Sequence, residues 1–170
     1  MAHLLPLLGL SLLAGCGTPV TPPAADAVGP ADVYGKPTLT IGGANDDGFG
    51  FVQWHEAPAH PKIVSGLQGG QHIWVSMRSQ NLWPEHMAIA VVMHDAATGA
   101  LVEPGEVNRM LKLLPRPGYD TYEGFVAYVS KPCAIAGKKV RVEMTVRDLY
   151  GVTAQDSAEI TPVWGGLCAP

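Results

Sequence analysis

The stretch Val140-Arg141-Val142-Glu143-Met144-Thr145-Val146-Arg147 decides the fold class of this chain, because its even-numbered residues are all apolar and its odd-numbered residues all polar. A β-strand points successive side chains to opposite faces of a sheet. Such alternation therefore predicts a strand with one buried face and one wet face. We expect a β-sheet that covers a hydrophobic core.

Further strands are expected before and after this segment. Apolar residues alternate with polar ones, or fill a short run after a turn, in the ranges 39–41, 73–78, 87–93, 125–129 and 157–163. The third of these ranges is apolar on both faces, which suits a strand in the centre of a sandwich, and a turn then leads into residues 101 and 102. Pro162 marks an edge or a strand end, because it cannot donate a ladder hydrogen bond.

One segment between Pro104 and Pro115 has helical spacing instead. Its apolar residues fall on one side of a helix, which predicts one short helix among the strands. These residues are Val107, Met110, Leu111 and Leu114.

Composition favours one β-rich domain. The chain has 170 residues, of which 20 are Gly and 15 are Pro, and both types disfavour long helices. A hydrophobic content of 47% suffices for one packed core. We expect an all-β, two-sheet sandwich of about seven or eight short strands. The net charge of −4 and the lack of a basic run disfavour nucleic acid as a partner.

The end of the chain resembles the last hairpin of an immunoglobulin-like domain, in which a strand, the turn Asp148-Leu149-Tyr150-Gly151 and a second strand follow one another. The cysteine and tryptophan spacing of antibody domains is not present. The resemblance therefore implies an immunoglobulin-like arrangement of two sheets and nothing about function.

Cys133 and Cys168 are expected to form a disulfide. If the final turn has four residues, Arg147 faces Val152, paired residue numbers add up to 299, and position 133 faces position 166. Both thiols would then lie at the open end of one hairpin, within bridging reach. The alternatives are two buried free thiols or a metal or redox pair, although no CxxC spacing is present.

The amino terminus predicts a signal peptide. Residues 4–13 form an apolar block interrupted only by Pro6, Gly9 and Ser11, and its length fits a signal-peptide core. At about 1.5 Å rise per residue, the block is too short to span a hydrocarbon layer of roughly 30 Å. It departs from the usual pattern in that no Lys or Arg precedes it.

Leu13-Ala14-Gly15-Cys16 follows this block and resembles the lipobox of bacterial lipoproteins. The resemblance implies cleavage between Gly15 and Cys16, a diacylglyceryl group on the Cys16 thiol and acylation of the new amino terminus. Several acyl chains make such an anchor effectively permanent. Gly17 stands where an aspartate would resemble an inner-membrane retention signal, so the resemblance implies the outer membrane of a bacterial envelope.

Three segments follow from these assignments. Residues 1–15 are the expected lipoprotein signal peptide. Residues 16–36 are the lipidated cysteine and a flexible, disordered tether rich in Pro, Ala and Gly. Residues 37–170 are the expected sandwich domain.

Histidine and methionine residues could bind copper or zinc if their strands converge. His55, Glu56 and His60 have the spacing HExxxH rather than the zinc motif HExxH, and a proline interrupts the helix that the motif needs. Asn45-Asp46-Asp47-Gly48 lacks the downstream acid of a calcium loop and is interpreted as a turn. Methionine on strands more often fills a core, so no metal ligand is assigned. The residues considered for a soft-metal site are His72, His86, His94, Met77, Met87 and Met93.

No catalytic motif stands out, because the chain lacks a GxSxG elbow, a Walker A loop, a dinucleotide-binding glycine pattern and CxxC. A catalytic site assembled from distant residues remains an alternative. Trp54, Trp74 and Trp83 could build an aromatic face for a glycan or peptide, with at least one of them in the core. Trp74 is the best candidate for exposure or for packing between sheets.

These patterns favour a lipid-anchored envelope protein whose sandwich is a non-catalytic binding or structural module. Its expected partners are a membrane, through the anchor, and a protein or glycan ligand. No cofactor is expected beyond the covalent lipid on Cys16. The alternatives are a His- and Met-based metal-binding protein and an enzyme with a dispersed site.

Overall fold

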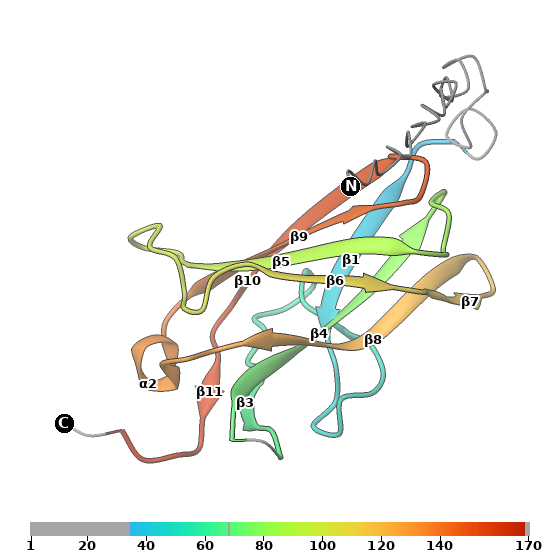
Figure 1. Ribbon diagram of the computed structural model, residues 1–170. Coiled ribbons are helices and arrows are strands. Elements are labelled where there is room, and N and C mark those ends of the chain that lie inside the picture. Colours follow the sequence, from blue (N-terminus) through green and yellow to red (C-terminus); the bar gives the residue numbers. More distant parts are fainter. Residues whose placement is uncertain (1–34, 68, 169–170) are drawn as a thin grey trace, which may run out of the picture.

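The computed structural model of the protein describes residues 35–67 and 69–168. Their regular secondary structure is almost entirely β-strand, with one short helix (Figure 1). The predicted signal peptide, Cys16 and nearly all of the predicted tether lie outside the described residues. The elements are β1 (Thr38–Gly43), β2 (Val52–Gln53), β3 (Lys62–Ser65), β4 (Gln71–Gln80), β5 (Met87–Asp95), β6 (Val107–Leu111), β7 (Leu114–Arg116), β8 (Tyr119–Tyr128), α2 (Pro132–Ile135), β9 (Val140–Arg147), β10 (Thr153–Ile160) and β11 (Val163–Trp164).

The strands form two sheets that pack face to face. In the seven-stranded sheet, β4 pairs with β8 on one side and with β1 and β3 on the other, while β2, β7 and β11 extend the edges. The four-stranded sheet has the order β10-β9-β5-β6. All pairs are antiparallel except β11 with β3, which is parallel.

The predicted all-β, two-sheet sandwich is therefore confirmed. The strand count is higher than expected because β2, β7 and β11 span only two or three residues each, too few to show a pattern in the sequence. Without these three, eight of the eleven strands remain, which is the expected number.

The core lies between the two sheets. Val142, Met144 and Val146 of β9 point into it and are almost fully buried, as their alternation predicts. Ile73 and Val75 of β4 belong to the same cluster and come from the facing sheet. Full burial of an aliphatic side chain of this size contributes about 1.5–3 kcal/mol, so this shared core holds the sheets together.

The short helix predicted in the range 107–114 is wrong. This segment forms β6, which pairs with β5, and then begins β7, which pairs with β8 in the other sheet. Its apolar residues do not share one buried face, since Val107 is buried while Met110 and Leu114 are exposed. Pairing with existing strands satisfies backbone groups that a helix would have satisfied internally. A short helix lies elsewhere, at α2, and begins with Pro132 in its first turn, where proline is tolerated.

Two finer expectations also differ from the structure. β5 is buried on one face only, because Ile89 and Val91 lie in the core while Ala88 is exposed on the outer face. The hairpin between β9 and β10 has a turn one residue longer than expected. Arg147 consequently pairs with Thr153, and paired residue numbers add up to 300.

Asp148 explains the longer turn. Its carboxylate accepts the backbone N–H groups of Tyr150 and Val152, each at 2.9 Å. Aspartate favours such turns because its side chain bonds to backbone shortly after itself. The same carboxylate accepts the N–H of Trp83 at 3.1 Å, which ties the β9–β10 turn to the β4–β5 connection.

The predicted disulfide between Cys133 and Cys168 is present, with a Cα–Cα distance of 5.6 Å. Cys133 lies in α2 rather than on an extension of β9, so hairpin pairing with position 166 is not what brings the two residues together. Cys168 follows β11, which pairs with β3. The disulfide therefore ties the end of the chain to α2.

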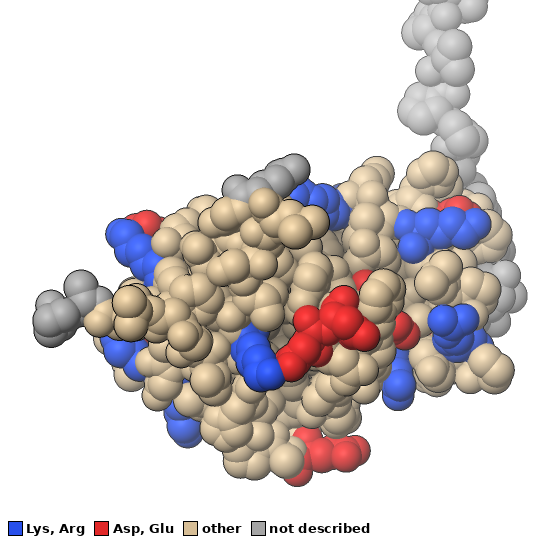
Figure 2. Space-filling model, turned by 90° about the horizontal axis from the view of Figure 1, so that it is seen from below, with Lys and Arg blue, Asp and Glu red and all other residues tan. Residues whose placement is uncertain are grey.

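Charged side chains of both signs lie on the surface. Figure 2 shows one face with an acidic group near its centre and Lys and Arg side chains around it and toward both ends. No large area of one sign covers this face. Within the described ranges, no helix is both long enough and apolar enough to cross a membrane.

Candidate functional site

The histidines and methionines considered as metal ligands are dispersed. His72 points out from the seven-stranded sheet, whereas His94 lies on the four-stranded sheet, 4.0 Å from an oxygen of Glu143, and His86 lies in the β4–β5 connection. In the part of the chain that the structure describes, no three His, Cys, Asp or Glu side chains form a group suited to a metal ion. The methionines of this set are buried in the core: Met77, Met87 and Met93.

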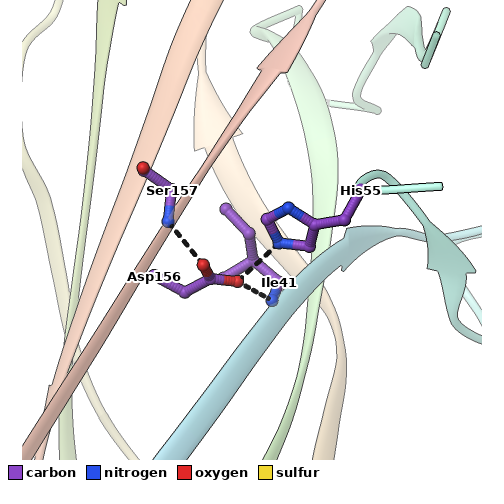
Figure 3. A network of polar contacts seen from close by, with 4 residues as sticks. All are labelled: Ile41, His55, Asp156 and Ser157. Carbon is purple, nitrogen blue, oxygen red and sulfur yellow. Dashed lines mark hydrogen bonds and ion pairs between the residues drawn. The ribbon is translucent and has the colours of Figure 1, made fainter. Parts of the chain in front are cut away.

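His55, from the HExxxH segment, pairs with Asp156 (Figure 3). Nε2 of His55 lies 2.7 Å from Oδ2 of Asp156 on β10. The same oxygen accepts the backbone N–H of Ile41 on β1 at 2.8 Å, and Oδ1 accepts the backbone N–H of Ser157 at 2.8 Å. Glu56 and His60 take no part in this network and are exposed.

This network is not a serine–histidine–aspartate triad, although it contains the three residue types. A triad needs the serine hydroxyl hydrogen-bonded to the imidazole. Here Ser157 contacts Asp156 through its backbone nitrogen, and its hydroxyl points away from His55 (Figure 3). Asp156 instead joins β10 of one sheet to β1 of the other, which is a structural role.

The three tryptophans considered for an aromatic face are separated. Trp54 is buried in the core, which confirms that at least one of them belongs there. Trp83 lies in the β4–β5 connection at one end of the sandwich. Trp74 is half-buried on the outer side of β4, on an aromatic surface with other partners.

This aromatic surface covers the outer side of the seven-stranded sheet. His72 pairs across to Tyr128, and Trp74 pairs across to Val126, so these four side chains point outward together from β4 and β8. The rings of His72 and Trp74 meet edge to face with their centroids 4.2 Å apart. We define the aromatic face as Phe49, Phe51, His72, Trp74, Tyr119 and Tyr128, together with Arg78.

Arg78 occupies one end of the aromatic face. Its guanidinium carbon lies 4.2 Å from the centre of the Phe51 ring and 4.7 Å from that of Tyr119. Such cation–π contacts hold a charged donor group in a fixed place. The aromatic face therefore combines rings with a hydrogen-bond donor.

The β1–β2 loop is packed down on this face. A Cβ added to Gly48 would lie 3.0 Å from the Trp74 indole, and a Cβ added to Gly124 would lie 2.3 Å from the Gly48 carbonyl oxygen. Gly48 also closes the turn expected at 45–48, since its N–H donates to the Asn45 carbonyl at 2.9 Å. The loop is further held by the Gly50 N–H, which donates to Glu123 at 2.8 Å.

Two rings of the aromatic face are exposed. Phe49 follows Gly48 in the loop and is 68% exposed, and Tyr128 of β8 is 39% exposed. Exposed aromatic side chains on a rigid support lose little entropy when they bind a ligand. They are the residues best placed to contact a partner.

His72 lies next to Trp74 and across from Tyr128 on the aromatic face. His72 is only 5% exposed, and its Nε2 has no hydrogen-bond partner among the described residues. Burial disfavours the imidazolium and lowers the pKa of His72 below its usual value. The aromatic face therefore holds a neutral imidazole at neutral pH.

A cleft of about 770 Å³, lined by both polar and apolar residues, adjoins the same loop. Gln53, His60 and Lys62 are among its lining residues, and Lys62 forms an ion pair with Asp46 across it. The Oε1 atom of Gln53 is buried and has no partner within the described part of the chain. The cleft places these polar groups next to the β1–β2 loop.

No model of a known protein family matches the sequence, and a search of curated proteins finds no match. The site must therefore be judged by its own geometry. Reasoning from the sequence identified Trp74 but missed Phe49, Phe51, Tyr119 and Tyr128. The available signal was the position of Tyr128, which alternates with the buried side chains of its strand and so points outward.

Proposed function

We propose that the protein is a lipid-anchored protein of a bacterial envelope, and that its sandwich binds a glycan on the aromatic face without catalysis. The observation that carries the binding function is the pair of exposed rings, Phe49 and Tyr128, on a rigid aromatic surface. The anchor is inferred from Leu13-Ala14-Gly15-Cys16, and the outer membrane from Gly17.

A glycan suits this surface for two reasons. The apolar face of a sugar ring can stack on an aromatic side chain, which offers a large contact area at a small entropy cost. The hydroxyl groups of a sugar need fixed polar partners, which Arg78 and the neighbouring cleft supply.

Binding of the full chain to insoluble envelope polysaccharide tests the proposal. Phe49→Ala and Tyr128→Ala should each weaken the affinity about five- to tenfold, since loss of a ring at a binding centre costs about 1–1.4 kcal/mol. Met110→Ala is the matched control, because Met110 is about as exposed as Phe49 but lies on the outer face of the other sheet.

The glycan proposal fails if the wild-type chain is not retained by the polysaccharide, or if the ring variants are retained as well as the control. Retention by an envelope protein, with the same dependence on Phe49 and Tyr128, would instead identify a protein as the ligand.

Labelling with palmitate tests the anchor separately. The wild-type chain should incorporate labelled palmitate in bacteria, and Cys16→Ser should incorporate none, because Cys16 provides the thiol that accepts the lipid. Equal labelling of the two chains would contradict the anchor.

A further inference from the structure

A second exposed apolar surface lies at one end of the sandwich. It consists of Trp83, Leu149 and Tyr150, which are 36%, 59% and 57% exposed, and we call it the end cluster. The rings of Trp83 and Tyr150 meet edge to face with their centroids 5.9 Å apart. Adjacent apolar side chains that remain exposed often mark an interaction site.

The end cluster is held in place by one buried carboxylate. Asp148 is 5% exposed and accepts the backbone N–H of Trp83 at 3.1 Å and that of Tyr150 at 2.9 Å. The β4–β5 connection and the β9–β10 turn therefore keep a fixed relation, and the rings stay exposed although the turns around them are ordered.

The end cluster lies where the chain enters the domain. The Asn81 side chain donates to the backbone oxygen of Lys36 at 2.8 Å, which fixes the start of the domain close to Trp83. Figure 1 shows the β4–β5 and β9–β10 turns beside the beginning of β1, and β11 far from them. Gly35 is 19 positions after Cys16, so a lipid on Cys16 would hold this end within at most about 65 Å of the bilayer and let it touch the surface.

Two basic residues lie at the same end of the domain as the end cluster. Lys36 is exposed, and the guanidinium of Arg147 lies beside the β9–β10 turn, 3.5 Å from a Cβ placed on Gly151. Within the ranges described, neither has an ion-pair partner. In a chain of net charge −4, these two unpaired cations outnumber the one buried carboxylate of the cluster, Asp148, and give this end a charge complementary to anionic lipid.

We infer that the end cluster contacts the surface of an anionic membrane, with Trp83 and Tyr150 at the level of the lipid headgroups. This inference rests on the proposed lipid anchor. Trp and Tyr favour the membrane interface because each has an apolar ring and a polar group. Three side chains bind a bilayer weakly, so the contact requires the anchor to supply a high local concentration.

The test uses the full lipidated chain in vesicles of phosphatidylcholine and phosphatidylglycerol, with part of the lipid brominated on the acyl chain close to the headgroup. Bromine quenches tryptophan emission at short range, so part of the emission should be lost in brominated vesicles. Trp83→Phe should abolish this loss, and replacing both Leu149 and Tyr150 by Ser should reduce it strongly.

Trp164→Phe is the matched control, because Trp164 lies on β11, away from the end cluster, and its removal should leave the quenching intact. Flotation with the vesicles is measured in the same samples. If the chain floats but its quenching does not depend on Trp83, the inference is wrong, while the lipid anchor is still supported. A wild-type chain that floats no better than Cys16→Ser overturns the anchor, and the inference with it.

Discussion

Gly124 and Gly48 set the height of the β1–β2 loop above the sheet, because the backbone of one lies against the backbone of the other. Gly124 also has a φ of 74°, in the left-handed region that residues with a side chain rarely adopt. The exposed position of Phe49 therefore depends on the absence of a side chain at both Gly48 and Gly124.

Gly124→Ala should destabilise the fold more than Gly118→Ala. Gly118 has a φ of 85° and open space around it, so its substitution carries only the conformational cost, about 1–2 kcal/mol. Gly124→Ala adds a contact of 2.3 Å with a carbonyl oxygen, which forces the loop to move. Urea unfolding measures the free energy of unfolding of both variants, and an equal loss of stability in the two would contradict the packing of the loop.

His72 should make stability depend on pH. Its pKa is lowered in the fold from the ordinary value of 6.5 because the imidazole is buried. Below that value the unfolded chain binds a proton that the folded chain does not, so the free energy of unfolding should fall as the pH drops. His72→Gln should lower this slope between about pH 7 and about pH 5, a range set by the ordinary histidine pKa. An unchanged slope in urea unfolding would show that His72 does not contribute.

At the scale of elements, the shortest pieces are held by covalent or side-chain ties. β11 has two residues, which is too short to be stable through its pairing with β3 alone. The disulfide between Cys133 and Cys168 lies directly after it and limits how far the end of the chain can move.

Loss of this disulfide should destabilise the domain. The bond closes a loop with a sequence separation of 35, for which chain entropy gives about 4 kcal/mol. The variant in which both Cys133 and Cys168 are Ser should therefore unfold at lower urea concentration. It should also exchange the amide hydrogens of β3 and β11 faster than those of β9. Uniform exchange with no change in stability would contradict this role.

The segment of β6 and β7 illustrates the limit of periodicity at this scale. Its apolar spacing fits a helix, yet it forms two strands because β5 and β8 offer unpaired edges on either side. A sequence pattern records which side chains are apolar but not which neighbouring edges are free. The strands that alternate strictly, such as β9, were predicted correctly because their own neighbours in sequence fix the buried face.

At the scale of the whole molecule, Asp156 connects the two sheets through Ile41. The N–H of Ile41 belongs to a fully buried residue and has the Asp156 carboxylate as its acceptor. A buried donor left without a partner costs about 1–3 kcal/mol. Removal of the Asp156 carboxylate should therefore destabilise both sheets, because this contact links them.

Asp156→Ala should lower the free energy of unfolding by about 1–3 kcal/mol, the cost of one buried unpaired donor. The urea dependence of the transition should stay unchanged, since both sheets still unfold in one step. Ser157→Ala should change stability by less than about 0.5 kcal/mol, because Ser157 contributes only its backbone N–H to the network. A Ser157→Ala loss as large as that of Asp156→Ala would contradict a structural role specific to the carboxylate.

The sequence by itself determined the fold class, most strands and the disulfide partners of this protein. Alternation of apolar and polar residues indicates which face of a strand is buried, and it can be recognised within one segment because side chains repeat every two residues. The pairing of Cys133 with Cys168 was predicted because Cys16 was assigned to the expected lipidation site, which left two cysteines. The alternation in the sequence also predicted that Trp74 would be exposed or packed between the sheets, and the structure places Trp74 half-buried on the outer face.

Tertiary structure alone decided which side chains meet. The pairing register brings His72 and Trp74 of β4 beside Tyr128 of β8. Arg78 of β4 meets Phe51, which is far from it in sequence. The end cluster depends in the same way on Asp148, which brings together two turns far apart in sequence. Both surfaces arise from contacts over long sequence distances, which no local pattern encodes because the strands could pair in many orders.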